Sequence, residues 1–256
     1  MKLTHKLCGA AIVAAAGVAL AVPNTTKAAD DSKTGTGHIE FTLGTDTSDV
    51  IPTEPGVTDG TTITNLPSVT NPGEFGIIAV TPLEFDSHNV LTATNKRDYD
   101  ALAFTANPGS TTAGTEEFEV QNFVKYQDLR TQENHAYALS ATMTQNFQTA
   151  SGVELKGANI TYKNVYTTQT GSALLDPDGV NNTGGTIDSA SNNSITFIRN
   201  TGVNGIGYGQ FELNFGKVGD ASQEAAESVT LNIPDGSPIG SGDYNAVITW
   251  TLSETI

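Results

Sequence analysis

Short segments with alternating apolar and polar side chains are the feature of this sequence that most limits its fold. In the first of them, residues 38–43, the side chains of Ile39, Phe41 and Leu43 would share one face. Such alternation is typical of a half-buried β-strand, because successive side chains of a strand point to opposite faces. One helical turn is expected at 223–228, and no segment keeps a helical period over three turns. The sequence therefore predicts an all-β fold.

Further segments of the same kind follow along the chain, each ended by turn residues and many of them rich in threonine, which favours strands. They are residues 76–80, 117–124, 137–143, 159–162, 194–198, 211–215, 229–233 and 244–252. Many short strands at fairly regular spacing are typical of an antiparallel sandwich or barrel. We expect one antiparallel β-sandwich domain, immunoglobulin-like or related.

Residues 45–73 are rich in Pro, Thr, Asp and Gly. The four prolines of this segment, Pro52, Pro55, Pro67 and Pro72, are spaced so that neither a helix nor a central strand can persist. The composition predicts an extended surface linker that joins the edge strand 38–43 to the main body.

Residues 1–28 have the composition of a secretory signal peptide. Lys2 and Lys6 precede an apolar run at 7–22, and small residues near Ala28 offer a cleavage site. The run is shorter than the roughly 20 residues of a membrane-spanning helix, so an uncleaved anchor is the less favoured alternative. We expect an exported mature chain, residues 29–256, without a membrane span.

The charge is one-sided, with 12 Lys and Arg against 28 Asp and Glu and a net charge of −16. Loss of the three lysines in the signal peptide would make the net charge −19. A phosphate backbone would be repelled, so nucleic acid is not expected as a partner. The single Cys also lies in the signal peptide, so the exported chain must rely on a packed core rather than on disulfides.

Sequence motifs give no sign of catalysis, of a cofactor or of a metal site. G-x-S-x-G, H-E-x-x-H and a Walker loop are absent, and the glycine-rich stretch 202–209 precedes a strand rather than a helix, which favours a hairpin loop. The oxygen-rich stretch 176–182 lacks EF-hand spacing, so an Asx-rich turn is favoured over a calcium site. A glycan hydrolase remains an alternative, because paired carboxylates leave no short motif.

The C-terminal segment 244–252 alternates most strictly. One face would carry Tyr244, Ala246, Ile248, Trp250 and Leu252. The only tryptophan of the chain, Trp250, could be the central aromatic of a sandwich core. It could equally be an aromatic platform for a glycan or a partner chain, and both interpretations stay open.

Trp250-Thr251-Leu252 resembles the distal motif of the WxL-domain surface proteins of Gram-positive bacteria. The resemblance covers most of the mature chain. Residues 35–41 and the Pro-rich linker are similar to the family's N-terminal pattern, and Pro82-Leu83-Glu84-Phe85 is similar to the family's short motif that ends in an apolar-acidic-Phe step. Asp128-Leu129-Arg130 precedes Tyr137-Ala138-Leu139 as the family's Asp-x-Arg precedes its first W-x-L, and residues 155–158 resemble the segment that follows. Tyr137 is a departure, since the family has Trp there.

The resemblance implies a secreted, non-enzymatic protein held non-covalently on the cell wall through this domain. Its partners would be peptidoglycan or an associated wall polymer, and other surface proteins encoded alongside. The chain shows no L-P-x-T-G motif for covalent anchoring. Long-range attraction to anionic wall polymers is not available to such an acidic protein, so short-range contacts must carry the affinity. The candidate binding residues are Asp128, Arg130, Tyr137, Leu139, Tyr244, Trp250 and Leu252.

A second hypothesis is that the chain docks on the β-domain of a partner protein, for example as an adhesin for host matrix, and meets the wall only indirectly. The predicted edge strand Ile39 to Leu43, beside a Pro-rich linker, would suit strand addition. A third alternative is that both aromatic motifs belong to the core and that their loss would act only through unfolding.

Overall fold

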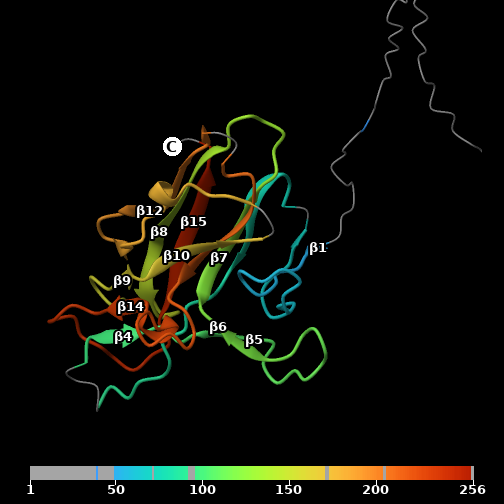
Figure 1. Cartoon of the computed structure of the whole chain (residues 1–256). Coiled ribbons are helices and arrows are strands. Elements are labelled where there is room, and N and C mark those ends of the chain that lie inside the picture. Colours follow the sequence, from blue (N-terminus) through green and yellow to red (C-terminus); the bar gives the residue numbers. More distant parts are fainter. Residues whose placement is uncertain are drawn as a thin grey trace, which may run out of the picture. The chain divides into compact units, whose positions relative to one another are not determined.

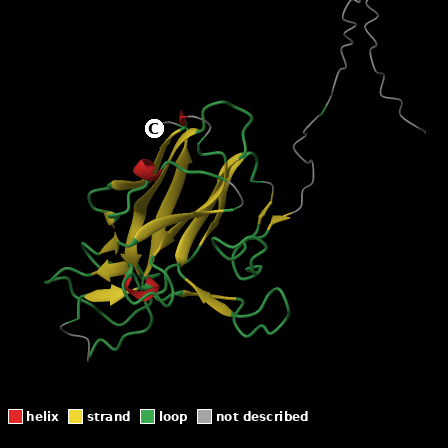
Figure 2. Cartoon of the chain, viewed as in Figure 1, coloured by secondary structure: helices red, strands yellow, loops and turns green. Residues whose placement is uncertain are grey.

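The computed structural model describes residue 39 and residues 49–70, 72–91, 96–170, 173–203 and 206–254. The predicted signal peptide and nearly all of the predicted strand 38–43 lie outside these residues. The described part is built of strands, all paired antiparallel, as predicted (Figures 1 and 2). None of its helices is long and apolar enough to cross a membrane. The strands belong to one compact unit, residues 43–256.

Three sheets form the body. We call them the motif sheet, which holds the two W-x-L-type segments, the opposite sheet and the end sheet. The motif sheet has the order β12 (Ser194–Thr201), β8 (Ala136–Gln148), β15 (Asn245–Ser253). The opposite sheet has the order β10 (Val165–Gln169), β13 (Gly209–Phe215), β7 (Asn122–Asp128), β3 (Phe75–Val80). The end sheet has the order β11 (Gly185–Asp188), β9 (Asn159–Tyr162), β14 (Val229–Asn232), β4 (Asp98–Asp100).

Most predicted strands are confirmed, and two kinds of difference remain. Residues 117–124, predicted as one strand, form β6 (Phe118–Val120), which pairs with β5 (Phe104–Ala106), and then β7 in the opposite sheet. Strands β4, β5, β10 and β11 were not predicted. Each has three to five residues, and at this length alternation is recognised in some strands, such as β9 and β14, and not in others. The predicted helical turn is confirmed as η3 (Ala225–Glu227).

The main core lies between the motif sheet and the opposite sheet. Along β8 the alternation predicted from the sequence places every second side chain inward, and Tyr137, Leu139, Ala141 and Met143 are fully buried. Tyr137 meets Tyr126 of β7 edge-on, with ring centroids 5.7 Å apart. This edge-on aromatic contact thus helps to join the two sheets as a sandwich.

The segment predicted as a surface linker covers the outer face of the opposite sheet instead. Its prolines do limit β1 (Asp49–Val50) and β2 (Val69–Thr70) to two residues each, which pair with one another. Ile63 and Leu66, however, are buried against Phe123 in a second apolar cluster. An apolar residue every few positions was enough to fix this Pro-rich segment on the sheet, which composition alone did not show.

Beneath this segment lies a buried ion pair. Lys125 Nζ of β7 is 3.0 Å from Glu212 Oε1 of β13, and the two side chains are 5% and 0% exposed. Thr168 Oγ1 donates to Glu212 Oε2 at 2.9 Å, and Lys125 Nζ donates to Thr53 Oγ1 at 3.3 Å. The pair is therefore shielded from water by the covering segment. The carboxylate and the ammonium each have a threonine hydroxyl as a further hydrogen-bond partner.

We expect Glu212→Leu to lower the free energy of unfolding by about 3 kcal/mol, because it leaves the Lys125 ammonium buried without its counter-charge. The double variant Lys125→Met/Glu212→Leu should recover most of this loss, since no buried charge then remains. Urea unfolding followed by circular dichroism measures both. Equal destabilisation in the single and double variants would contradict the assignment.

Candidate functional site

The C-terminal strand β15 presents one face to the core, as the sequence predicted. Tyr244, at the start of this strand, and Ala246, Ile248, Trp250 and Leu252 within it are each partly buried and pack against the main core. Trp250 lies among the three rings of Phe197, Phe215 and Tyr162, with centroids 5.4, 6.0 and 6.1 Å away. Contacts with these rings leave Trp250 little free face for stacking on a sugar. The structure thus favours the core interpretation of Trp250.

The first motif strand is buried even more completely. Tyr137 and Leu139 are both 0% exposed. The Tyr137 hydroxyl donates a hydrogen bond to the Gly207 carbonyl at 3.3 Å, and burial raises the pKa of this phenol. The polar tip of Tyr137, which replaces the tryptophan expected from the family pattern, is therefore satisfied inside the protein. Neither side chain can touch a ligand in this conformation.

Asp128 and Arg130 form a clamp at one end of the sandwich. Arg130 Nε and Nη2 donate to the two carboxylate oxygens of the fully buried Asp128 at 2.9 and 2.7 Å. The guanidinium carbon lies 4.0 Å from the centre of the Phe75 ring of β3. Arg130 Nη1 is 2.7 Å from Glu254 Oε1, just beyond β15. We call these residues the Arg130 clamp, because they tie the ends of β3, β7 and β15 together.

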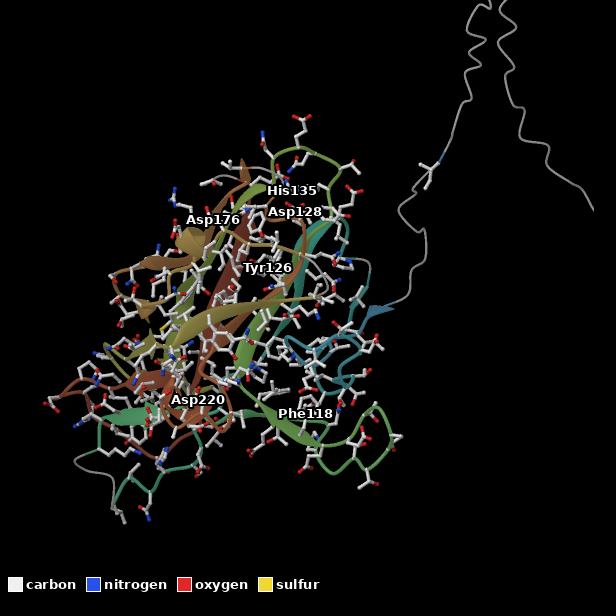
Figure 3. All side chains as sticks on the ribbon, viewed as in Figure 1. Phe118, Tyr126, Asp128, His135, Asp176 and Asp220 are labelled. Carbon is white, nitrogen blue, oxygen red and sulfur yellow. The ribbon has the colours of Figure 1, made fainter. Side chains whose placement is uncertain are left out.

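The clamp sets the charge state of Asp128. His135 lies beside Asp128 at the same end of the molecule (Figure 3), with Nδ1 3.1 Å from Asp128 Oδ2. Burial acts to raise the pKa of the Asp128 carboxyl, but hydrogen bonds from the Arg130 side chain and backbone, and from His135, outweigh it. The pKa of Asp128 is therefore lowered, and the aspartate is ionised at neutral pH.

The opposite, outward face of the motif sheet carries two rows of hydroxyl groups. In the strand register, Ser194, Thr142 and Thr249 lie side by side, as do Thr196, Ser140 and Thr251. All six are exposed or half-exposed. Adjacent strands are about 4.8 Å apart, so each row spaces its hydroxyls regularly. We call these six residues the hydroxyl rows. They contain no charged side chain, in a chain that carries 28 acidic residues.

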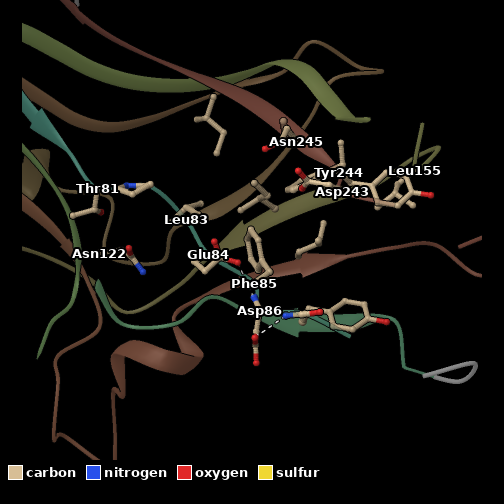
Figure 4. A pocket seen from close by; sticks show the side chains of 18 of the residues that line it. Thr81, Leu83, Glu84, Phe85, Asp86, Asn122, Leu155, Asp243, Tyr244 and Asn245 are labelled. Atoms are coloured by element: carbon tan, nitrogen blue, oxygen red, sulfur yellow. Dashed lines mark hydrogen bonds between the residues drawn. The ribbon is translucent and has the colours of Figure 1, made fainter. Parts of the chain in front are cut away.

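A groove of about 1140 Å³ opens beside β15 (Figure 4). Its walls are formed by residues 80–90, from the end of β3 onward, and by residues 239–246, which lead into β15; Trp250 also lines it. Phe85 reaches into the groove and meets Phe147 edge-on at 5.9 Å. Carboxylates of Glu84, Asp86 and Asp243 lie among the lining residues, which include no Lys or Arg.

The structure therefore divides the predicted site residues into two groups. Tyr244, Trp250 and Leu252 share one face of β15, whereas Asp128, Arg130, Tyr137 and Leu139 build the core and the clamp. Sequence reasoning missed the hydroxyl rows. The alternate positions of the same motif strands carried the signal, but the strand register was needed to align them. The stretch at 176–182 forms the predicted Asx turn, in which Asp176 Oδ1 accepts from the Asp178 backbone N–H at 3.0 Å.

Comparison with known proteins gives one match. A family described as "WxL domain surface cell wall-binding" matches residues 28–255, nearly the whole chain. No curated protein and no solved structure matches the chain.

If Trp250 acts through packing, Trp250→Ala should cost about 3 kcal/mol of stability, because it leaves a hole among three aromatic rings. Trp250→Phe should cost about 1 kcal/mol. Guanidinium unfolding followed by far-ultraviolet circular dichroism measures both, together with retention by isolated cell walls. A Trp250→Phe variant of unchanged stability that no longer binds walls would show a contact role instead.

The ionised Asp128 of the Arg130 clamp predicts an acid-dependent loss of stability. An acid with a depressed pKa stabilises the fold above its unfolded pKa of about 3.9, and this contribution disappears as the pH falls through the lower folded value. Asp128→Asn should lose about 2 kcal/mol at neutral pH. The free energy of unfolding of this variant should also fall less than that of the unaltered protein on acidification below about pH 4. Urea unfolding across this range, with the exposed Asp178→Asn as control, measures the effect, and parallel pH curves would disprove it.

Proposed function

Because this chain belongs to the WxL-domain family of surface cell wall-binding proteins, we propose that it is secreted and attaches non-covalently to the peptidoglycan of a Gram-positive cell wall. The observation that carries the proposal is the family match over residues 28–255, which includes both motif strands. The family binds walls and is not a family of enzymes, which supports a protein without catalytic activity. Peptidoglycan or an associated wall polymer is the partner that this function requires.

We place the wall contact on the hydroxyl rows of the motif sheet. A cell wall rich in anionic polymers repels the mature chain, whose net charge is −19, and the repulsion acts over about one Debye length, 8 Å in physiological salt. The hydroxyl rows carry no carboxylate, so this face can approach such a surface at lower electrostatic cost than a carboxylate-rich one. The hydroxyl groups can then donate to and accept from sugar hydroxyls and amides.

Several weak contacts would have to act together on this face. A single hydrogen bond contributes about 0.5–1.5 kcal/mol net, whereas micromolar binding needs about 8 kcal/mol. Two rows of three hydroxyls on one face of a sheet can contact a repeating polymer at several points at once. Thr249 Oγ1 is already oriented by Thr144 Oγ1 at 2.9 Å, which lowers the entropy lost on binding.

The motif residues would serve this surface indirectly. Trp250 and Leu252 fix β15 from its inner side, Tyr137 and Leu139 fix β8, and the Arg130 clamp fixes the end of β15. Loss of any of these contacts would disturb the register that aligns the hydroxyl rows. In this proposal the binding residues are Thr142, Thr249, Thr251 and their neighbours, and the aromatic motifs position them.

We expect the mature protein, residues 29–256, to co-sediment with purified Gram-positive sacculi, and Thr249→Glu to weaken retention severalfold. The new carboxylate would face the anionic wall and would replace a hydroxyl of the contact surface. Sedimentation at two salt concentrations, with and without EDTA, measures retention and tests whether a bridging cation contributes.

Thr186→Glu is the matched control. Thr186 is also an exposed strand threonine, and its hydroxyl lies 2.8 Å from that of Thr161 on the neighbouring strand, but it belongs to the end sheet. The control should bind as the unaltered protein does. Equal weakening of both variants would point to net charge rather than to the hydroxyl rows, and no retention of the folded unaltered protein would reject direct wall binding.

A further inference from the structure

The sandwich is open along one side, between β3 and β15. In the described part of the chain β3 pairs only with β7, and β15 pairs only with β8, so both are edge strands. Their core-facing side chains are less buried than those of the central strands. Phe75, Ile77, Ile248 and Trp250 are only partly buried, whereas Tyr137, Leu139, Ala141 and Met143 of β8 are 0% exposed. We call this opening the seam.

The seam is closed at one end and open at the other. At the end near Phe75, Arg130 bridges the two edges by contacting Phe75 and Glu254. At the other end β3 ends at Val80 and the chain continues through the segment that contains Phe85. The groove of Figure 4 opens between this segment and β15. A strand presents its backbone groups along its edge, and, among the described residues, residues 245–252 of β15 pair with no strand on the side of the groove.

Two buried polar atoms line the same groove without a hydrogen-bond partner in the described structure. They are the Tyr162 hydroxyl and Asn122 Oδ1. Buried polar groups are normally satisfied, and an unsatisfied one marks a place that a ligand or water can fill. The seam thus offers polar groups at its floor as well as an unpaired strand edge at its side.

Charge and shape restrict the occupant. Glu84, Asp86 and Asp243 line the groove and no Lys or Arg is among its described lining residues, so a phosphate-bearing polymer would be repelled. Phe197, Phe215 and Tyr162 already contact the ring of Trp250, which leaves less of its surface for a sugar to stack on. A second copy of the mature chain would bring another −19 of net charge to the acidic groove. An extended chain with basic side chains meets all these conditions.

We propose that the seam accepts a β-strand of a partner protein, one that alternates apolar with basic residues. The strand would add to the free edge of β15 through main-chain hydrogen bonds and bury its apolar side chains beside Trp250 and Phe85. Its basic side chains would face Glu84, Asp86 and Asp243. This interaction goes beyond wall attachment, because it uses the edge of the motif sheet and not its outer face.

The only tryptophan lines the seam, so its fluorescence reports occupancy directly. The mature protein is titrated with a nine-residue peptide, Lys-Val-Lys-Ile-Thr-Val-Lys-Ile-Thr. Saturable binding with a blue shift of Trp250 emission is expected, as the ring loses contact with water. A peptide with Glu in place of Lys should bind more weakly, as should a Lys peptide that is N-methylated at alternate residues, which cannot complete a strand ladder.

Asp243→Lys should weaken binding of the Lys peptide about fivefold, whereas Asp178→Lys, an equal charge change outside the groove, should not. The proposal is overturned if the Lys peptide leaves Trp250 emission unchanged, or if the Glu and N-methylated peptides bind equally well. It is also overturned if a chitin oligosaccharide produces the same shift, or if the Lys peptide binds only after residues 29–48 are deleted. Sedimentation with sacculi is measured separately, so failure of the seam does not mimic failure of wall binding.

Discussion

The packing of Trp250 among Phe197, Phe215 and Tyr162 is the contact on which the rest of the structure depends. In the described part of the chain β15 has a single neighbouring strand, β8, so strand pairing holds it from one side. Three aromatic contacts of Trp250 on its inner face add to this pairing. The Arg130 clamp then fixes the end of the strand through Glu254. One strand is thus held from its inner face and its end, which leaves its outer face exposed for binding.

This arrangement explains why a motif used to recognise a wall-binding family consists of core residues. In a strand, residues two apart share a face, so Trp250 and Leu252 must point inward together. Thr249 and Thr251 then point outward, opposite the hydroxyls of β8 in the observed register. A short motif can therefore mark a binding surface without forming it. The inward residues tolerate few side chains because they fill a packed core, and the outward ones need only be small, polar and uncharged.

The sequence predicted the strands whose alternation is long enough to show, and this was enough for the fold class. β9 and β14 were located almost to the residue, and β15 with its inward face was also correct. The folding of the Pro-rich segment onto the opposite sheet was not predictable, because Ile63 and Leu66 form no periodic pattern. The candidate site was even harder to predict from the sequence. The Arg130 clamp joins residues 75, 128, 130 and 254, and only tertiary packing brings them together. Alternation likewise shows which residues face outward but not which strands are neighbours, so the hydroxyl rows appear only in the register.

The two proposed binding surfaces meet on β15 without competing. A strand that adds to the edge of a sheet extends it sideways, and the face of the original strands stays exposed. A partner bound in the seam would therefore leave Thr249 and Thr251 free to contact the wall. It would also bury the partly exposed Trp250 and Ile248, and this added packing would hold β15 more firmly. Since a ligand that binds only the folded state stabilises it, a partner in the seam would help to maintain the register of the hydroxyl rows. Wall binding and partner docking would then support each other through the rigidity of one strand.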